Sequence, residues 1–333
     1  MILDEAVGFV LPLRRRFRGT TVREGLLLRV GEMWGEWAPF PEYDDDVAAR
    51  WLRGALEAAR GQWPQSRRDD VAVNAIVPAL DARAATELVV DAVTVDGCTV
   101  IKVKVADRGQ GFDEDVARVA AVRTALDDTG AAVGRIRVDV NGGWTVDEAV
   151  ERLDVLSDIA DGLEYAEQPC ATLDECAEVR SRLPHVPVAV DEGARLAVTL
   201  DDALVAAIRD AADVVVLKAI PLGGVRAALD LAARLGLPVT VSGSLDSTVG
   251  LSSALALAGA LPDEPLASGL GTGRLLAADT TDETALPQDG RLSGVRRPPD
   301  PAALASVRLD DGRAEWWQER LQRCLEIVER TAT

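Results

Sequence analysis

Three acidic residues each close a short apolar run whose composition predicts a β-strand. Asp139, Glu167 and Asp191 stand at these positions in three consecutive repeats of the chain. Carboxylates are costly to bury, and three that converge on one site repel one another unless a cation lies among them. Because sites built only from oxygen ligands favour hard ions, we predict that the three residues bind Mg²⁺, with Mn²⁺ as the alternative. A single such residue would more commonly be a helix N-cap, but three in succession favour the metal site.

Three lysines offer the complementary chemistry of a proton acceptor or a fixed positive charge. Lys102 and Lys104 are two residues apart in the apolar run 101–105, so their side chains point to the same face of a strand. That face is solvent if the strand lies at a sheet edge, or the interior if the strand belongs to a barrel, which has no edge. Lys218 closes a later apolar run. A lysine beside other positive charge, Mg²⁺ included, has a destabilised ammonium form and can act as a neutral base near pH 7.

The elements that must position these residues repeat from about residue 71. A β-branched run, a polar turn and an amphipathic helical stretch recur roughly every 24 to 35 residues. The runs span residues 71–77, 99–105, 135–140, 163–167, 186–190, 214–218, 238–241 and 266–269. Eight parallel strands alternating with helices form either a closed barrel or a doubly wound sheet. In a barrel, the three acidic residues end the third, fourth and fifth strands, with lysines on the second and sixth strands at either side.

The remaining sequence predicts two regions outside the repeats. Residues 1–69 are predicted to form a small α+β capping domain, and residues 70–285 the barrel. Residues 286–333 are predicted to return to the capping domain through a charged helix. We also expect the charged segment 13–24 and the aromatic loop 34–43 to close over the barrel mouth as a flexible lid.

The overall composition limits the classes of partner and chemistry. The 333 residues carry a net charge of −19, which repels phosphate backbones and anionic lipid, so we expect neither nucleic acid nor membrane as a partner. The single histidine, His185, excludes multi-histidine metal sites and most His-centred triads. Four cysteines without CxxC spacing indicate reduced thiols. With no recognisable targeting segment or membrane span, we expect a cytoplasmic protein.

The order and spacing of five short motifs resemble the enolase superfamily, in its muconate-lactonizing subgroup. The motifs are Lys102-Val103-Lys104, Asp139-Val140-Asn141, Glu167-Gln168-Pro169, Asp191-Glu192 and Lys218. The resemblance extends over roughly the whole chain. It implies a modified TIM barrel, (β/α)7β, with an α+β cap that the C-terminus completes. It also implies proton abstraction next to a substrate carboxylate with the help of Mg²⁺.

Within this subgroup the chain most resembles the o-succinylbenzoate synthases of menaquinone biosynthesis. The resemblance implies syn dehydration of 2-succinyl-6-hydroxy-2,4-cyclohexadiene-1-carboxylate to o-succinylbenzoate. The supporting segments are residues 35–43 (GEWAPFPEY) and 242–250 (SGSLDSTVG). Dipeptide epimerases carry an acidic pair after the eighth strand, where this chain has Gly269-Leu270-Gly271, so a substrate ammonium has no obvious partner. A glycine-rich mouth instead offers backbone N–H groups and room for an anionic tail.

The resemblance also implies roles for individual residues. Lys104 would take the proton α to the ring carboxylate and return it to the departing hydroxyl. Lys102 would hydrogen-bond that carboxylate, and Lys218 would stabilise the enolate by its charge. Glu192 is expected to orient Lys218. Expected substrate contacts are Arg137, Asn141, Ser242, Gly243 and Gly269, although Arg137 fits a structural role in the barrel equally well.

Two other functions stay open. An N-acylamino-acid racemase of the same superfamily would use Lys104 and Lys218 as opposed acid and base, and both lysines are present. A catalytically silent barrel would serve as a binding module, although the intact set of three acidic residues argues against it. Both enzymatic alternatives take a small-molecule carboxylate as substrate. The sequence leaves the oligomeric state open.

Overall fold

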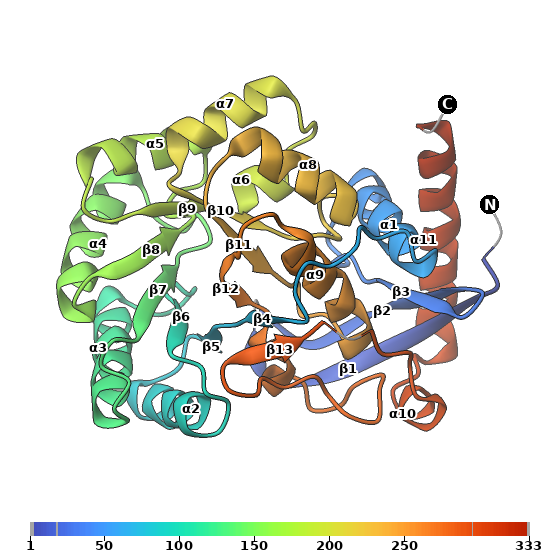
Figure 1. Cartoon of the computed structure of the whole chain (residues 1–333), viewed down its shortest axis with the longest axis horizontal. Coiled ribbons are helices and arrows are strands. Elements are labelled where there is room, and N and C mark those ends of the chain that lie inside the picture. The colour runs from blue at the N-terminus through green and yellow to red at the C-terminus, as the bar shows by residue number, and fades with distance from the viewer. Residues whose placement is uncertain (1–2, 18, 295, 332–333) are drawn as a thin grey trace.

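The barrel is a parallel sheet of eight strands. In the computed structural model, which describes residues 3–17, 19–294 and 296–331, the strands are hydrogen-bonded in chain order. They are β5 (Ala75–Val77), β6 (Val100–Lys104), β7 (Arg135–Asp139), β8 (Leu163–Glu167), β9 (Val188–Val190), β10 (Val214–Leu217), β11 (Val239–Ser242) and β12 (Leu266–Gly269). The first and last strands meet where the Asn74 backbone N–H donates to the Ser268 carbonyl oxygen at 2.9 Å. The predicted modified TIM barrel is confirmed (Figure 1).

Helices surround the sheet, and each barrel helix follows a strand in the chain. They are α2 (Ala82–Thr94), α3 (Phe112–Asp128), α4 (Val146–Ala160), α5 (Leu173–Arg182), α7 (Asp202–Ala211), α8 (Val225–Leu235) and α9 (Thr248–Ala260), with the short α6 (Glu192–Arg195) after β9 and the 3-10 helix η1 (Gly271–Leu275) after β12. Thr145 and Thr172 begin α4 and α5 as N-caps, each with a glutamate three residues on in a capping box. Within the described ranges, no helix is long and apolar enough to cross a membrane.

The capping domain packs an antiparallel sheet against helices from both ends of the chain. Its elements are β1 (Glu5–Phe17), β2 (Thr20–Val30), β3 (Met33–Trp37), α1 (Asp45–Ala59) and α11 (Asp311–Arg330). Helix α11 runs beside α1, on the side of the capping sheet away from the barrel strands (Figure 1). Trp37, Trp51 and Trp317 are buried together in this core. Large aromatic side chains therefore join the two ends of the chain.

Three predicted segments differ from the structure. In the charged segment 13–24, residues 13–17 lie in β1 and residues 20–24 in β2, with Phe17 opposite Thr20, while Arg18 lies outside the described residues. The aromatic loop begins later than predicted, because Met33–Trp37 pairs with β2. The predicted strand 71–77 is divided: β4 (Asp70–Ala72) pairs with β13 (Arg291–Ser293), and only β5 belongs to the barrel. Helix α10 (Pro301–Ser306) then leads to α11. The exact domain boundaries stay a prediction.

Candidate active site

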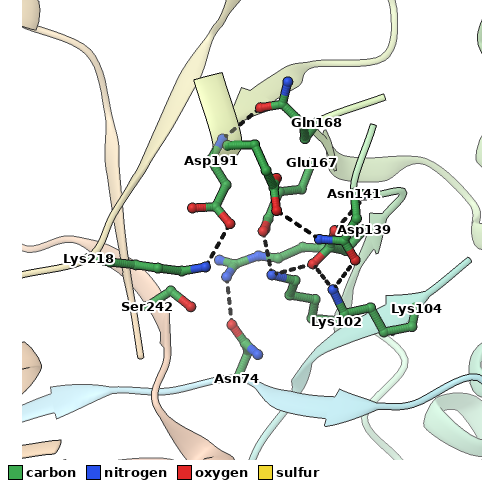
Figure 2. Close-up of polar contacts among 12 residues, drawn as sticks. Asn74, Lys102, Lys104, Asp139, Asn141, Glu167, Gln168, Asp191, Lys218 and Ser242 are labelled. Carbon is green, nitrogen blue, oxygen red and sulfur yellow. Dashed lines mark hydrogen bonds and ion pairs between the residues drawn. The ribbon is translucent and has the colours of Figure 1, made fainter. Parts of the chain in front are cut away.

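The three predicted metal ligands lie near one another at the C-terminal end of the barrel. Asp139 is the last residue of β7, Glu167 is the last residue of β8, and Asp191 directly follows β9. Parallel pairing sets Asp139 beside Glu167 on neighbouring strands. Each residue is only 1% exposed. The fold therefore brings together the three acidic residues that the sequence pattern had grouped (Figure 2).

Two lysines of β6 contact these carboxylates from one side. Lys102 Nζ lies 2.8 Å from an Asp139 oxygen and 2.6 Å from a Glu167 oxygen, so it bridges the two residues. Lys104 Nζ lies 2.5 Å from Asp139 Oδ2 and 2.5 Å from Asn141 Oδ1. Both lysines therefore point into the barrel mouth (Figure 2), where their amines meet the carboxylates at the ends of β7 and β8.

Lys218 approaches from the opposite side and binds the third carboxylate. Its Nζ lies 2.6 Å from Asp191 Oδ2 (Figure 2). Arg195 holds the same carboxylate, with Nε at 3.2 and 3.3 Å from the two Asp191 oxygens, and its Nη1 donates to the Tyr43 hydroxyl at 2.9 Å. Sequence reasoning missed Arg195, whose one signal is its position four residues after Asp191. Through Arg195 the capping domain is hydrogen-bonded to the acidic group of the barrel.

The buried charges shift one another's pKa values in different directions. Burial raises the pKa of Glu167 to about 7, and the neighbouring Asp139 carboxylate adds to this shift. Burial alone would lower the pKa of Lys102, but Asp139 and Glu167 outweigh it and the pKa is raised. The pKa of Lys104 is lowered, because burial and the nearby Lys102 together exceed the opposing effect of Asp139. Lys102 is thus a fixed cation, and Lys104 is the lysine that loses its proton more readily.

The donor chemistry of the three carboxylates suits a hard divalent cation. Glu167 Oε2 is buried without a hydrogen-bond partner, and all the side-chain donor atoms are oxygens. In the part of the chain that the structure describes, no three His, Cys, Asp or Glu side chains lie close enough together to hold an ion as they stand. Lys102 lies between Asp139 and Glu167 instead. A cation that binds here must therefore take over contacts that the ammonium groups now make.

A small pocket of about 40 Å³ opens beside these groups. Lys104 and Lys218 line it from opposite sides (Figure 2). Ser242, Gly243 and Gly269, which the sequence placed in the substrate site, line the same pocket, and so does Asn141. The arrangement places two amines on the two sides of one small cavity, with acidic residues between them.

Phe17 of the β1–β2 hairpin also reaches this pocket. Its ring centroid lies 5.6 Å from Lys104 Nζ, and its ring packs with Ile76, Leu245 and Leu275 of the barrel. Phe17 falls in the segment predicted to close over the mouth, but sequence reasoning did not single it out. The hairpin thus supplies an apolar wall beside the amine of Lys104.

Two predicted site residues have contacts other than those expected. Arg137 is fully buried below the pocket, donates to Asn74 Oδ1 at 2.9 Å, and lies 4.6 Å from the Tyr165 ring centroid. These contacts support its structural role in the barrel rather than substrate contact. Glu192 accepts hydrogen bonds from Asn141 and Arg195. It therefore orients these two side chains, while Asp191 holds Lys218.

Strained backbone marks the loops that carry the site. Asn141, Gln168 and Leu245 have positive φ angles of 50°, 43° and 63°, a region that residues with a side chain adopt at a cost. Gln168 Oε1 accepts hydrogen bonds from the backbone N–H groups of Asp191 and Gly193, at 3.2 and 3.1 Å. The amide of Gln168 thus fixes the neighbouring strand end, which explains a residue that sequence reasoning left without a role.

Comparison with known families agrees with the fold. The family model described as enolase C-terminal domain-like matches residues 84–299, and the model described as enolase N-terminal domain-like matches residues 9–59. The muconate lactonizing enzyme from Pseudomonas fluorescens, complexed with muconolactone, has a TM-score of 0.77 at 20% identity, over 92% of this chain and 99% of that chain. The L-Ala-D/L-Glu epimerase from Bacillus subtilis has a TM-score of 0.71 at 18% identity, over 89% and 96%. The chain belongs to the enolase superfamily.

Relatives of higher identity narrow this assignment. The o-succinylbenzoate synthase of Thermobifida fusca is 50% identical over 314 residues, which are 94% of each chain. The o-succinylbenzoate synthase of Mycobacterium ulcerans is 45% identical over 330 residues, covering 99% of this chain and 96% of the relative. Within the superfamily, the chain belongs to the o-succinylbenzoate synthase family, as the resemblance of its motifs had indicated.

Proposed function

We propose that this protein dehydrates 2-succinyl-6-hydroxy-2,4-cyclohexadiene-1-carboxylate to o-succinylbenzoate, a step of menaquinone biosynthesis. The observation that carries the proposal is the placement of Lys104 and Lys218 on opposite sides of one pocket, whose wall includes the buried carboxylates of Asp139 and Asp191. The family supports the choice of substrate, since relatives at 44–50% identity over nearly the whole chain are o-succinylbenzoate synthases.

Asp139, Glu167 and Asp191 are proposed to hold Mg²⁺, which enzymes of this superfamily use together with a lysine or histidine base. The bound ion would supply positive charge to stabilise the substrate carboxylate as negative charge develops on it. Mn²⁺ has the same preference for oxygen donors and would fit the same residues. Support comes from the all-oxygen donor set and from the buried, unpartnered Oε2 of Glu167.

Lys104 is proposed to act first as the base and then as the acid. In its neutral form its Nζ takes the proton from the ring carbon next to the carboxylate. The same group, now protonated, gives that proton to the departing hydroxyl, which leaves as water on the same face of the ring. Asp139 and Asn141 orient Nζ by hydrogen bonds of 2.5 Å each. The lowered pKa of Lys104, caused mainly by burial, favours the first step.

Lys102 and Lys218 are proposed to contribute charge and position rather than proton transfer. Lys102 now contacts Asp139 and Glu167, and once a cation takes over these carboxylates its ammonium group can donate to the substrate carboxylate. Lys218 faces the other side of the ring and stabilises the enolate by its positive charge. Ser242, Gly243 and Gly269 line the pocket, and we propose that they contact the substrate.

N-acylamino-acid racemisation is the second candidate, because both lysines line the same pocket. Moving a proton from one face of a carbon to the other needs one amine on each side, which Lys104 and Lys218 offer. Incubation of the protein and Mg²⁺ with the cyclohexadiene carboxylate, and separately with N-succinyl amino acids, gives the two values of kcat/KM. We expect the dehydration value to be the larger. A larger value for racemisation, or equal turnover in a chelator, would contradict the proposal.

A further inference from the structure

Two segments that the sequence singled out meet at a buried carboxylate outside the pocket. Glu36, in segment 35–43 of the capping domain, accepts a hydrogen bond from the Ser247 backbone N–H at 3.0 Å and another from the Ser247 hydroxyl. Ser247 belongs to segment 242–250 and is the N-cap of α9. Glu36 is only 2% exposed. The carboxyl group of a capping-domain residue is therefore buried against the N-terminus of a barrel helix.

The contact requires a glycine in the first turn of α9. A Cβ atom at Gly250 would lie 2.5 Å from both Cδ and Oε2 of Glu36, far inside van der Waals distance. The Gly250 backbone N–H also donates to the Ser247 hydroxyl at 3.3 Å. The missing side chain therefore leaves the space that the cap carboxylate occupies.

Ser247 directly follows the turn that lines the pocket. Residues 242–245 are all part of the pocket wall, and Leu245 has a positive φ. Asp246 accepts a hydrogen bond from the Ser244 backbone N–H at 2.8 Å. This turn between β11 and α9 is thus strained at one residue and fixed at its far end by a residue of the other domain.

The surroundings of Glu36 favour its neutral, protonated form, which suits a group that acts through hydrogen bonds. Burial raises the pKa of Glu36 to about 8, Asp246 adds to the shift, and Arg23 of β2 opposes it. Burial also raises the pKa of Asp246, and the positive charge of Lys218 opposes this shift. A carboxyl group that keeps its proton near neutral pH can remain beside Asp246 at a lower electrostatic cost.

We propose that Glu36 is a positioning residue, which holds the pocket turn 242–246 from the capping domain in the conformation that binds substrate. The identity of the substrate in this inference rests on the proposed function. The role of Glu36 in fixing the turn is independent of that function.

Glu36→Ala and Gly250→Ala test the inference, because the first removes the group that accepts from Ser247 and the second displaces it. Glu24→Ala is the matched control: Glu24 also pairs within the capping domain, with Arg313 of α11. Hydrogen exchange of substrate-free protein should be about tenfold faster over residues 242–250 in both test variants, and unchanged in the control. If a test variant does not fold, Ser247→Ala, which loses only the hydroxyl contact, is measured in its place.

Steady-state kinetics give the second readout. We expect KM to rise about tenfold in the test variants, with kcat within about threefold and Mg²⁺ affinity unchanged, since no carboxylate of the barrel mouth is altered. Unchanged exchange over 242–250, or a KM that moves no more than in Glu24→Ala, would overturn the inference. If exchange responds as expected while the wild type does not turn over the cyclohexadiene carboxylate, the proposed function fails and the positioning role stands.

Discussion

Replacing each lysine by arginine separates the roles assigned to Lys104 and Lys218. Arginine keeps the positive charge but stays protonated at any working pH, so it can replace a fixed charge and not a proton acceptor. Positioned proton transfer contributes typically about 10²–10⁴-fold to a rate. Because Lys104 is proposed to serve as both base and acid, we expect Lys104→Arg to lose about 10⁴-fold in kcat, the upper end of that range.

The expected loss in Lys218→Arg is smaller, and its size is estimated from the hydrogen bond to Asp191. Lys218 Nζ lies 2.6 Å from Asp191 Oδ2 and the residue is 6% exposed, so the longer guanidinium must shift this hydrogen bond while keeping its charge nearby. A hydrogen bond to a charged group contributes about 1.5–3 kcal/mol. Loss of all of it corresponds to a decrease in kcat of about 10- to 150-fold, well short of the effect at Lys104.

The assay is the initial rate of o-succinylbenzoate formation at saturating Mg²⁺. Circular dichroism and calorimetric Mg²⁺ titration serve as controls for folding and metal binding. As a cross-check in D₂O, Lys218→Arg should still exchange the α-proton of a bound N-acyl amino acid, from the Lys104 side only. A racemase would lose turnover with either replacement. Equal collapse of dehydration in both variants, with folding and Mg²⁺ binding intact, would refute the division of labour between the two lysines.

Four further changes have defined expected outcomes. Asp191→Ala should abolish Mg²⁺-dependent turnover and weaken Mg²⁺ binding in calorimetry, and full activity of this variant in a chelator would contradict the metal assignment. The pKa of Glu36 is raised from 4.5 to about 8 in the folded protein, so its stabilising effect is complete below about pH 4.5 and is lost as the pH rises through 8. The urea midpoint should therefore fall between pH 6 and pH 9, and fall less in Glu36→Gln. Tyr43→Phe removes the 2.9 Å hydrogen bond from Arg195 and should lower the unfolding free energy by about 0.5–1.5 kcal/mol, measured in urea. Leu321→Ala empties a site that is 5% exposed in the core of the capping domain and should cost about 2–5 kcal/mol; a cost below 1 kcal/mol would show that α11 is not part of that core.

The sequence predicted the parts of the site that follow from local pattern. An acidic residue at the end of an apolar strand and two lysines on one strand face are signals within a few residues, and the barrel converts them into neighbours. Glu36 and Phe17 carry no such signal, because each contacts a residue far away in the chain. Arg195 shows only its spacing from Asp191, and nothing in the sequence indicates its contact with Tyr43. The contacts between the two domains exist only after the capping domain has docked on the barrel.

Long-range contacts also explain why the predictions for residues 13–24 and for Arg137 were incomplete. The charged run after Leu13 lacks the alternation of a typical strand, yet it is held in β1, and Arg14 Nε donates to the Leu276 carbonyl oxygen at 2.9 Å. Arg137 looked suited to substrate by its place two residues before Asp139. Its full burial and its contact with Asn74 depend on the barrel interior, whose filling cannot be read from a single strand.

The last helix of the chain completes the first domain, and this orders events during synthesis. Trp317 of α11 packs edge-on against Trp37 of β3, with ring centroids 5.4 Å apart. Translation proceeds at about 5–20 residues per second, so on the order of tens of seconds pass between the exit of the two partners from the ribosome. Throughout that interval the apolar face of the nascent cap lacks its cover, even if the barrel has already formed. The capping domain therefore cannot bury its core until α11 has been translated, and until then its apolar face is accessible to chaperones and proteases.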